Sequence, residues 1–369
     1  MLDIKKTGVG YYTASMIESL AALPSDSIEL TGYYFDFLSH NGKKPPTSSN
    51  IKYHKIKYIP GKLLSLCRRF NFQPPLELFV RKNVDITLFT NYVSLPSMYK
   101  HRTALVIYDL SFLDQPQYLQ DINLDYLKRF CPPSISRADL IITISEFTKT
   151  RILHYFPNLS GRIVVTPIPP ASAEEPSALG TRLTTLGIRS KKYILYLGTI
   201  EPRKNIQKLV QAYAQLDPTI RQRNALVLAG GKGWKDDAIK SEITTARQNG
   251  CNIIETDYVS EAEKAQLYAH SACFVFPSHY EGFGMPILEA MQYQVPVLAS
   301  DIAVFHEVAG DAAAYFDKDN PVDIARCMTE LLNDTGKSNT LVANGTRRLQ
   351  NFSWVENADK VYAAFTSIL

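Results

Sequence analysis

Residues 276–301 read FPSHYEGFGMPILEAMQYQVPVLASD, in which apolar strand patterns flank a glycine-rich turn and a helix. The glycines permit positive φ, and Pro286 suits the first position of a helix, so we predict a helix start near residue 286. Glu281 then lies in the loop and Glu289 in the first helical turn. The N–H groups at that helix start would face both carboxylates, which suits a ligand with hydroxyls and phosphate. The alternative is a capped core helix whose acids are favoured by the helix dipole.

Short apolar runs alternate with helical or loop segments on both sides of this stretch. They cover residues 28–35, 85–90, 103–109 and 140–145, then 193–199, 225–231, 252–259, 273–278 and 295–301. This alternation predicts βα units and parallel sheets that are buried on both faces. Ligands of such sheets bind beyond the carboxyl ends of the strands, where Asn91, Asp109 and Ser145 are placed.

The length of 369 residues favours two domains. Residues 157–192 are rich in proline and small polar residues, which indicates an interdomain linker. We expect a Rossmann-like domain at 1–170, a linker at 171–192, a second Rossmann-like domain at 193–351 and a final helix at 352–369.

The amino-terminal segment predicts a loop that runs into an amphipathic helix, with Gly8 and Gly10 in the loop. A doubly wound domain would place a buried strand before that loop, yet only residues 1–4 precede it. The first strand is therefore either very short or truncated.

The composition is that of a globular protein, with 45% hydrophobic and 21% charged residues. A net charge of +4 is too small to indicate a nucleic-acid partner. The five scattered cysteines favour a reducing compartment, and no CxxC or HxxxH pair indicates a metal site. Without an apolar run of membrane-spanning length or a signal peptide, we expect a cytoplasmic protein or one peripheral to a membrane.

Residues 51–72 carry basic side chains and no acid, interleaved with tyrosine, isoleucine and leucine. The basic residues are Lys52, Lys55, Lys57, Lys62, Arg68 and Arg69. Such a stretch could contact an anionic membrane surface or a phosphorylated acceptor. A solvated strand edge followed by a loop is the alternative.

The second half opens with a strand that ends in GTIEPRKN, residues 198–205. Gly198 permits a turn, and Arg203 and Lys204 precede a helix. The guanidinium fork and the ammonium charge would together offset most of the charge of a diphosphate without a metal. A solvated helix start is less favoured, because cations at that end oppose the helix dipole unless an anion is present.

Two later strand ends offer further contacts. Gly230, in AGGKGW, would let the backbone approach a ligand, or could be a plain turn. Tyr258 and Val259 follow the third strand, where a nucleotide base could lie. The Asp-x-Asp triplet at 317–319 is read as a surface cap and not as a metal site.

Together, EPRKN, AGGKGW, the E-x7-E pair of HYEGFGMPILEA and the amino-terminal TGVGYYT resemble the retaining glycosyltransferases of family 4. The resemblance covers nearly the whole chain. It implies an α/β GT-B fold, in which two doubly wound Rossmann-like domains flank a cleft. The first domain would bind the acceptor, the second would bind the nucleotide sugar, and the last helix would cross back to the first domain.

The resemblance also implies roles for individual residues. Arg203 and Lys204 would hold the diphosphate, Glu281 would contact the donor sugar and Glu289 the ribose. Backbone groups of five turn residues would face the sugar or close over the phosphates: Gly282, Phe283, Gly284, Gly8 and Gly10. Many relatives have a His-Asp pair where this chain has Tyr108-Asp109, so Asp109 becomes the candidate for orienting the acceptor.

The function implied is retaining, metal-independent transfer of a mannose- or rhamnose-like sugar from a nucleotide diphosphate sugar. GDP-sugars are favoured over UDP-sugars, and the nucleotide sugar is a substrate, so no cofactor is expected. The acceptor would be a glycan or a lipid-diphosphate-linked glycan of surface polysaccharide (O-antigen) biosynthesis, at the inner face of the plasma membrane.

Three alternatives remain at this point. The first is another GT-B activity, such as phosphorolysis or sugar-nucleotide epimerisation, of which a phosphorylase would need a lysine for a pyridoxal cofactor. The second is a non-catalytic GT-B-fold subunit of a polysaccharide assembly complex, which would not need the four charged motif residues Arg203, Lys204, Glu281 and Glu289. A dinucleotide oxidoreductase would rest only on Gly8 and Gly10, without a full GxGxxG.

Overall fold

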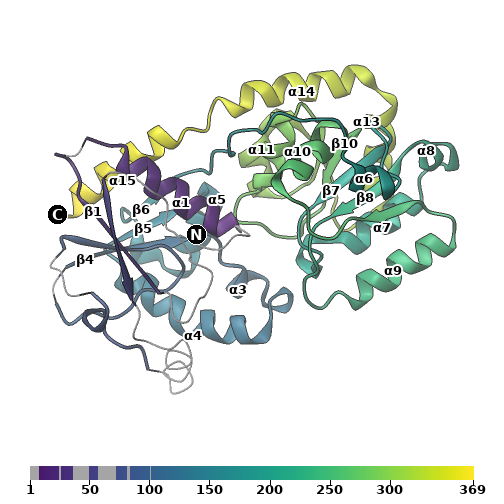
Figure 1. The fold of residues 1–369 in the computed structure, drawn as a ribbon. Helices are drawn as coiled ribbons and strands as arrows, with labels where there is room; N and C mark the ends of the chain where they lie inside the picture. The colour runs from purple at the N-terminus through teal and green to yellow at the C-terminus, as the bar shows by residue number, and fades with distance from the viewer. Residues whose placement is uncertain (1–7, 25, 36–49, 57–71, 81–83, 100) are drawn as a thin grey trace. The chain divides into compact units, whose positions relative to one another are not determined.

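The computed structural model describes residues 8–369 apart from 25, 36–49, 57–71, 81–83 and 100 (Figure 1). The chain divides into two compact units. The first unit comprises Met1–Ile168 and Ser353–Leu369, and the second comprises Pro169–Phe352. Each unit is built from parallel strands and helices.

The second unit contains a six-stranded sheet in the order β12-β11-β10-β7-β8-β9, and every pair in it is parallel. Its strands are β7 (Tyr193–Leu197), β8 (Ala225–Ala229), β9 (Ile253–Glu255), β10 (Cys273–Phe276), β11 (Val297–Ser300) and β12 (Ala313–Phe316). Five of them lie in the predicted apolar runs, whereas β12 was not predicted. The chain builds one side of the sheet through β8 and β9, and the other through β10 to β12. Its direction of winding therefore reverses between the neighbouring strands β7 and β10.

Helices and short 3-10 turns connect these strands. They are α6 (Thr181–Thr185), η4 (Pro202–Lys204), α7 (Ile206–Ala214), α8 (Pro218–Arg223), α9 (Asp237–Gln248), α10 (Glu261–Ala269), α11 (Met285–Gln292), α12 (Ala303–Ala309), η5 (Gly310–Ala312), α13 (Pro321–Asn333) and α14 (Thr335–Leu349). The start of α11 at Met285 confirms the predicted helix start. Glu289 is the fifth residue of that helix, so its predicted place in the first turn was wrong.

The segment expected to link the units packs along the second one. The Gly180 N–H donates to Gln266 Oε1 at 2.9 Å, and the Arg182 guanidinium forms an ion pair with Glu263 at 2.7 Å. Both partners lie on α10, so these bonds hold this part of the proline-rich segment against the second unit.

The first unit has two separate parallel sheets: β1 with β2, and β3-β4-β5-β6. The strands are β1 (Leu30–Phe35), β2 (Ile51–Ile56), β3 (Ile86–Phe89), β4 (Arg102–Ile107), β5 (Leu140–Thr143) and β6 (Ile163–Val165). The helices and turns are α1 (Gly8–Ala21), η1 (Leu76–Leu78), α3 (Ser111–Asp114), η2 (Pro116–Tyr118), α4 (Asp121–Arg137), α5 (Glu146–Tyr155), η3 (Pro157–Leu159) and α15 (Trp354–Ile368). Strand β6 lies in the proline-rich stretch that the sequence suggested as linker.

The last helix, α15, packs against the first described helix. The Trp354 ring lies 6.2 Å from the Tyr11 ring and 5.6 Å from the Tyr12 ring between centroids. Gly8 and Gly10 lie within α1 itself, so the predicted loop at these positions is corrected to helix.

Candidate active site

The candidate site lies at the carboxyl ends of β7 and β10, where the winding direction of the sheet reverses. Ligands of open α/β sheets bind at such a switch point, because the loops of the two neighbouring strands diverge there. The loop after β7 contains η4, which brings Arg203 and Lys204 to this edge. Asn205 ends the turn with a φ of 57°. The loop after β10 brings Glu281 to the same edge.

Four charged side chains from these two loops form one cluster. Arg203 Nη1 donates to Glu281 Oε2 at 2.8 Å and to the Tyr280 carbonyl at 2.8 Å. Arg203 Nη2 donates to Glu201 Oε1 at 2.8 Å. The Lys204 ammonium donates to Glu281 Oε1 at 2.5 Å. The Glu281 carboxylate therefore accepts a hydrogen bond from each of the two cations that the sequence assigned to phosphate binding.

The two carboxylates of the cluster are buried, and its two positive charges are matched by two negative ones. Glu201 is 2% exposed and Glu281 is 9% exposed. Burial opposes ionisation of Glu281, but the charges of Arg203 and Lys204 outweigh it and lower the pKa of this carboxyl to about 2. Burial raises the pKa of Glu201 and lowers that of Lys204. Two carboxylates thus already compensate the two cations that the sequence assigned to a diphosphate.

Glycines allow the loops at this edge to lie against one another. Gly230 has a φ of 147°, and a Cβ added to it would lie 2.0 Å from the Gly198 carbonyl oxygen. The Gly198 N–H donates to the Ala229 carbonyl, and the Ile200 N–H to the Gly231 carbonyl. Gly198 and Gly230 therefore hold together the turn that presents Arg203.

The turn before α11 is equally restricted. Gly284 has a φ of 122°, and a Cβ on it would lie 3.0 Å from the Phe305 ring. Phe283 is buried, with its ring centroid 6.0 Å from that of Phe352. Its side chain anchors the loop that carries Gly282 and Glu281.

Glu289 belongs to a second ion-pair cluster. Its Oε1 accepts from the Lys264 ammonium at 2.9 Å, and its Oε2 accepts from the Tyr268 hydroxyl at 3.0 Å. Burial lowers the pKa of Lys264, but the charges and hydrogen bonds of Glu289 and Glu261 together outweigh burial, so the net shift is upward. Both partners of Glu289 lie on α10, four residues apart on one face.

Sequence reasoning missed Glu201, Lys264 and Tyr268. The helical spacing of Lys264 and Tyr268 was a usable signal for a shared face. Glu201 had a weaker signal, because it lies two residues before Arg203 in a turn whose geometry the sequence does not give. The remaining predicted contacts follow β9: Tyr258 is 47% exposed, and Val259 is 8% exposed.

In the first unit, Asp109 follows β4, and its Oδ1 accepts from the Ser111 N–H at 2.8 Å. Its neighbour Tyr108 is buried, and its hydroxyl donates to the Thr90 carbonyl at 2.8 Å and lies 3.1 Å from Thr13 Oγ1. Burial raises the pKa of Tyr108. This tyrosine is therefore a neutral, hydrogen-bonded core residue.

Two expectations from the sequence concern metal binding and membrane contact. No group of three His, Cys, Asp or Glu side chains in them could hold a metal ion. The triplet at 317–319 forms a turn in which the Asp319 N–H donates to Asp317 Oδ1 at 2.9 Å. No helix in the described ranges is long and apolar enough to cross a membrane. Of the basic stretch, Ile51–Ile56 form β2, whereas 57–71 lie outside the described residues.

Known proteins resemble this chain in sequence and in structure. The family described as "Glycosyl transferases group 1" matches residues 185–348. The O-antigen chain mannosyltransferase B of Escherichia coli is 34% identical over 69% of this chain and 67% of that protein. The serotype-specific mannosyltransferase WbdA of E. coli is 31% identical over 73% of this chain, which spans 34% of WbdA.

Solved structures confirm the predicted GT-B fold class. The sucrose-phosphate synthase of Thermosynechococcus elongatus aligns with a TM-score of 0.73 at 17% identity, over 98% of this chain and 93% of that one. WaaG, a glycosyltransferase involved in lipopolysaccharide biosynthesis, aligns with a TM-score of 0.71 at 12% identity, over 98% and 97%.

Proposed function

The chain belongs to the group 1 glycosyltransferases, and from this premise we propose that it transfers a mannose- or rhamnose-like sugar with retention. The donor is a nucleotide diphosphate sugar, with GDP-sugars favoured. The acceptor is a glycan or lipid-diphosphate-linked glycan of O-antigen biosynthesis. Two E. coli relatives are mannosyltransferases by name, which supports the sugar and the pathway class.

The observation that carries this proposal is the cluster of Arg203, Lys204 and Glu281 at the switch point of the second sheet. A partly buried guanidinium and ammonium beside each other would suit a diphosphate, because low local polarity strengthens each charge-assisted hydrogen bond. Glu281 holds both cations in place before the donor arrives, so little reorganisation is needed at the moment of reaction.

In the proposed reaction, the bond between the anomeric carbon and the diphosphate oxygen breaks, and a bond from that carbon to the acceptor oxygen forms on the same face. The acceptor proton passes to the departing phosphate oxygen. Arg203 and Lys204 stabilise the charge that develops on the diphosphate. Glu281 orients the donor sugar and Glu289 the ribose, and no metal ion is required.

The other predicted contacts remain part of the proposal. Asp109 would orient the acceptor, and the backbone of Gly8 and Gly10 would approach the diphosphate. The residues around 51–72 would contact an anionic membrane surface, which places the enzyme at the inner face of the plasma membrane.

A thermal-shift panel with GDP, UDP, ADP and dTDP tests the donor class, because a nucleotide that binds the folded state raises its melting temperature. We expect GDP to give the largest shift. NMR of the anomeric proton in donor and product then tests retention. No stabilisation by any of the four nucleotides would overturn the proposal, and so would loss of transfer in EDTA that a divalent ion restores.

A further inference from the structure

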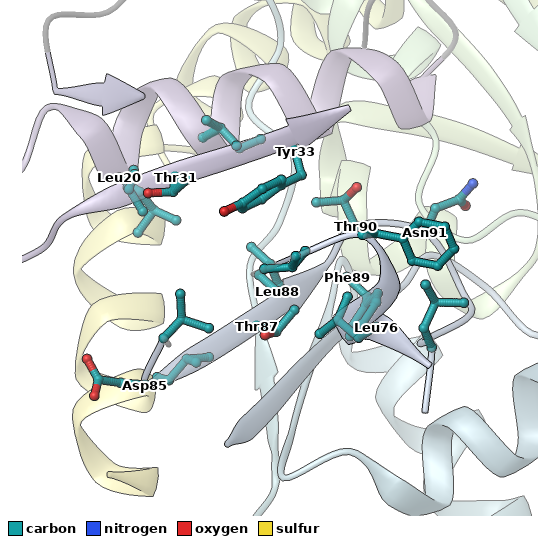
Figure 2. A pocket seen from close by; sticks show the side chains of 18 of the residues that line it. Leu20, Thr31, Tyr33, Leu76, Asp85, Thr87, Leu88, Phe89, Thr90 and Asn91 are labelled. Carbon is teal, nitrogen blue, oxygen red and sulfur yellow. The ribbon is translucent and has the colours of Figure 1, made fainter. Parts of the chain in front are cut away.

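A cavity of about 890 Å³ lies in the first unit, and Figure 2 shows side chains of β1 and β3 around it. Among the described residues that line it, the only charged ones are Glu29 and Asp85, and most of the others are apolar. A nucleotide diphosphate would meet two carboxylates and no cation there, which is electrostatically unfavourable. The charged groups that suit a donor nucleotide lie instead at the strand ends of the second sheet.

One arginine of the second unit holds the loop at 256–260, which joins β9 to α10 and is called the β9–α10 loop below. Arg182 lies in α6, and its Nη1 pairs with Glu263 on α10 at 2.7 Å. Its Nη2 donates to the Thr256 carbonyl and, at 3.4 Å, to the Tyr258 carbonyl. The β9–α10 loop is thus held by a side chain that lies 74 positions earlier in the sequence.

The start of the β9–α10 loop is placed by backbone bonds. The Thr256 N–H donates to a carbonyl of β8 at 3.2 Å, and the Asp257 carbonyl accepts from the Gly230 N–H at 3.1 Å. Asp257 has a φ of 56°, in the left-handed region, so the chain turns sharply there. Beyond this turn, the Arg182 guanidinium holds the Tyr258 carbonyl. Backbone pairing therefore places the start of the loop, and Arg182 places the part that follows.

The ion pair of Arg182 extends this contact to the first turn of α10. Glu263 completes a capping box there: its Oε2 accepts from the Ser260 N–H at 2.9 Å, and its N–H donates to Ser260 Oγ at 3.2 Å. Burial raises the pKa of the Glu263 carboxyl, but the bonds from Ser260 and Arg182 outweigh burial, so the net shift is downward. Two side chains of the same helix hold Glu289. Arg182 therefore fixes both the loop and the start of the helix that contacts Glu289.

A second arginine makes the same kinds of bond to strand β9 itself. Arg247 of α9 donates from Nε and Nη2 to the Ile253 carbonyl, at 3.1 and 2.9 Å, and pairs with Glu255 at 3.0 Å. Its side chain is 43% exposed, and that of Arg182 is 44% exposed. The two arginines are therefore matched in chemistry and exposure, but Arg247 holds the strand and Arg182 holds the loop that follows it.

We propose that Arg182 positions the β9–α10 loop as a wall of the site for the nucleobase of the donor. The inference rests on the proposed function, in which Tyr258 and Val259 lie at the base. Groups that are held in place before binding give higher affinity, because ordering them during binding costs free energy. Arg203 and Lys204, which would meet the diphosphate, lie in the loop after β7. Recognition of the base and of the diphosphate can therefore be measured separately.

The test compares Arg182→Gln with Arg182→Lys and with the matched control Arg247→Gln, all in the full chain. Glutamine removes the charge and shortens the side chain, whereas lysine keeps the charge and can restore one carbonyl bond. Isothermal titration calorimetry gives the dissociation constants of GDP, UDP and inorganic pyrophosphate, and steady-state kinetics give the donor KM and kcat. The melting temperature shows whether each variant is folded.

We expect Arg182→Gln to weaken the preferred nucleotide roughly tenfold and to bring the affinities for GDP and UDP closer together, because the loop is no longer held before binding. Pyrophosphate should bind within about twofold of wild type, and the donor KM should rise while kcat changes less than about threefold. Arg182→Lys should recover part of the nucleotide affinity, and Arg247→Gln should retain all of it.

Nucleotide affinity of Arg182→Gln within about twofold of wild type would overturn the inference. Equal weakening of GDP and pyrophosphate would overturn it too, because the whole unit and not the base site would then have loosened. An equal loss of affinity in Arg247→Gln would have the same meaning. A wild-type protein that binds neither nucleotide would contradict the proposed function and this inference with it, so the two failures are distinguishable.

Discussion

Glu281 and Glu289 are equally buried, at 9% exposure each, yet they take part in different ion-pair clusters. Glu281 bridges Arg203 and Lys204 across the switch point of the sheet. Glu289 contacts Lys264 and a tyrosine hydroxyl on a neighbouring helix. Their spacing in the sequence suggested one shared ligand space. The difference shows that the partners of a buried carboxylate, and not its spacing or burial, indicate its role.

The cluster that contains Glu281 is the proposed site of the reaction, and the largest expected effect on kcat is that of a substitution at its Lys204. Lys204→Ala removes a partly buried ammonium that would stabilise the leaving diphosphate, and we expect kcat to fall roughly 10³-fold. The matched control is Lys337→Ala, because Lys337 pairs with Glu330 at the half-exposed surface of α14. Turnover of the control should stay within about twofold. A Lys204 variant with near wild-type kcat would contradict the assignment.

The next effect concerns Glu281 itself. Glu281→Gln keeps the shape of the side chain but leaves the partly buried Arg203 and Lys204 with one carboxylate, so we expect kcat to fall roughly 10²-fold and stability to drop by about 3 kcal/mol. Steady-state kinetics and urea unfolding measure the two effects separately. An unchanged kcat with reduced stability would mean that the cluster is structural only.

The same carboxylate predicts a pH dependence of stability. The folded-state pKa of Glu281 is about 2, below its usual value, so its contribution is present above the unfolded-state pKa and is lost as the pH falls through about 2. The difference in unfolding free energy between wild type and Glu281→Gln should shrink by up to about 3 kcal/mol between pH 5 and pH 2. Urea titrations across this range measure it, and a constant difference would exclude the linkage.

A tenfold effect is expected at Glu201, one of the three residues that the sequence did not point to. Glu201 receives one Arg203 N–H and fixes the plane of the guanidinium. In Glu201→Gln the amide oxygen can still accept, but the charge is lost, so we expect kcat to fall roughly tenfold. Circular dichroism and melting temperature monitor the fold. If Glu201→Ala and Glu201→Gln lower kcat equally, orientation by this carboxylate is not the cause.

The smallest effect on kcat is expected at Glu289, which is proposed to bind the ribose of the donor. Glu289→Gln should weaken GDP binding several-fold through the lost ribose contact, with kcat changed less than about threefold. Isothermal titration calorimetry with GDP and the kinetics of transfer distinguish the two quantities. A fall in kcat as large as that of Glu281→Gln would place both glutamates in one functional group.

The sequence predicted most of the strands because buried parallel strands are short, apolar and separated by helices, as in β7 and β8. It did not predict β6 and β12, which are three and four residues long. It identified Arg203 and Glu281 as site residues, but their pairing joins positions 78 apart in sequence. That contact depends on the order of strands in the sheet, which local patterns do not encode.

The local sequence pattern also did not predict that β1 and β3 belong to two separate sheets. Which strands pair with one another depends on contacts between distant parts of the chain, as in β1 with β2 and β3 with β4. Tyr108 shows the opposite case. The sequence left its role open, and its bonds to Thr13 and Thr90 assign it to the core.

The central claim is that Arg203 and Lys204 carry the departing diphosphate, and single-turnover release of GDP from GDP-mannose tests it most directly. With enzyme in excess over donor, we predict that Arg203→Ala slows release at least 10²-fold while the melting temperature shows a folded protein. A single-turnover rate within about threefold of wild type would contradict the claim.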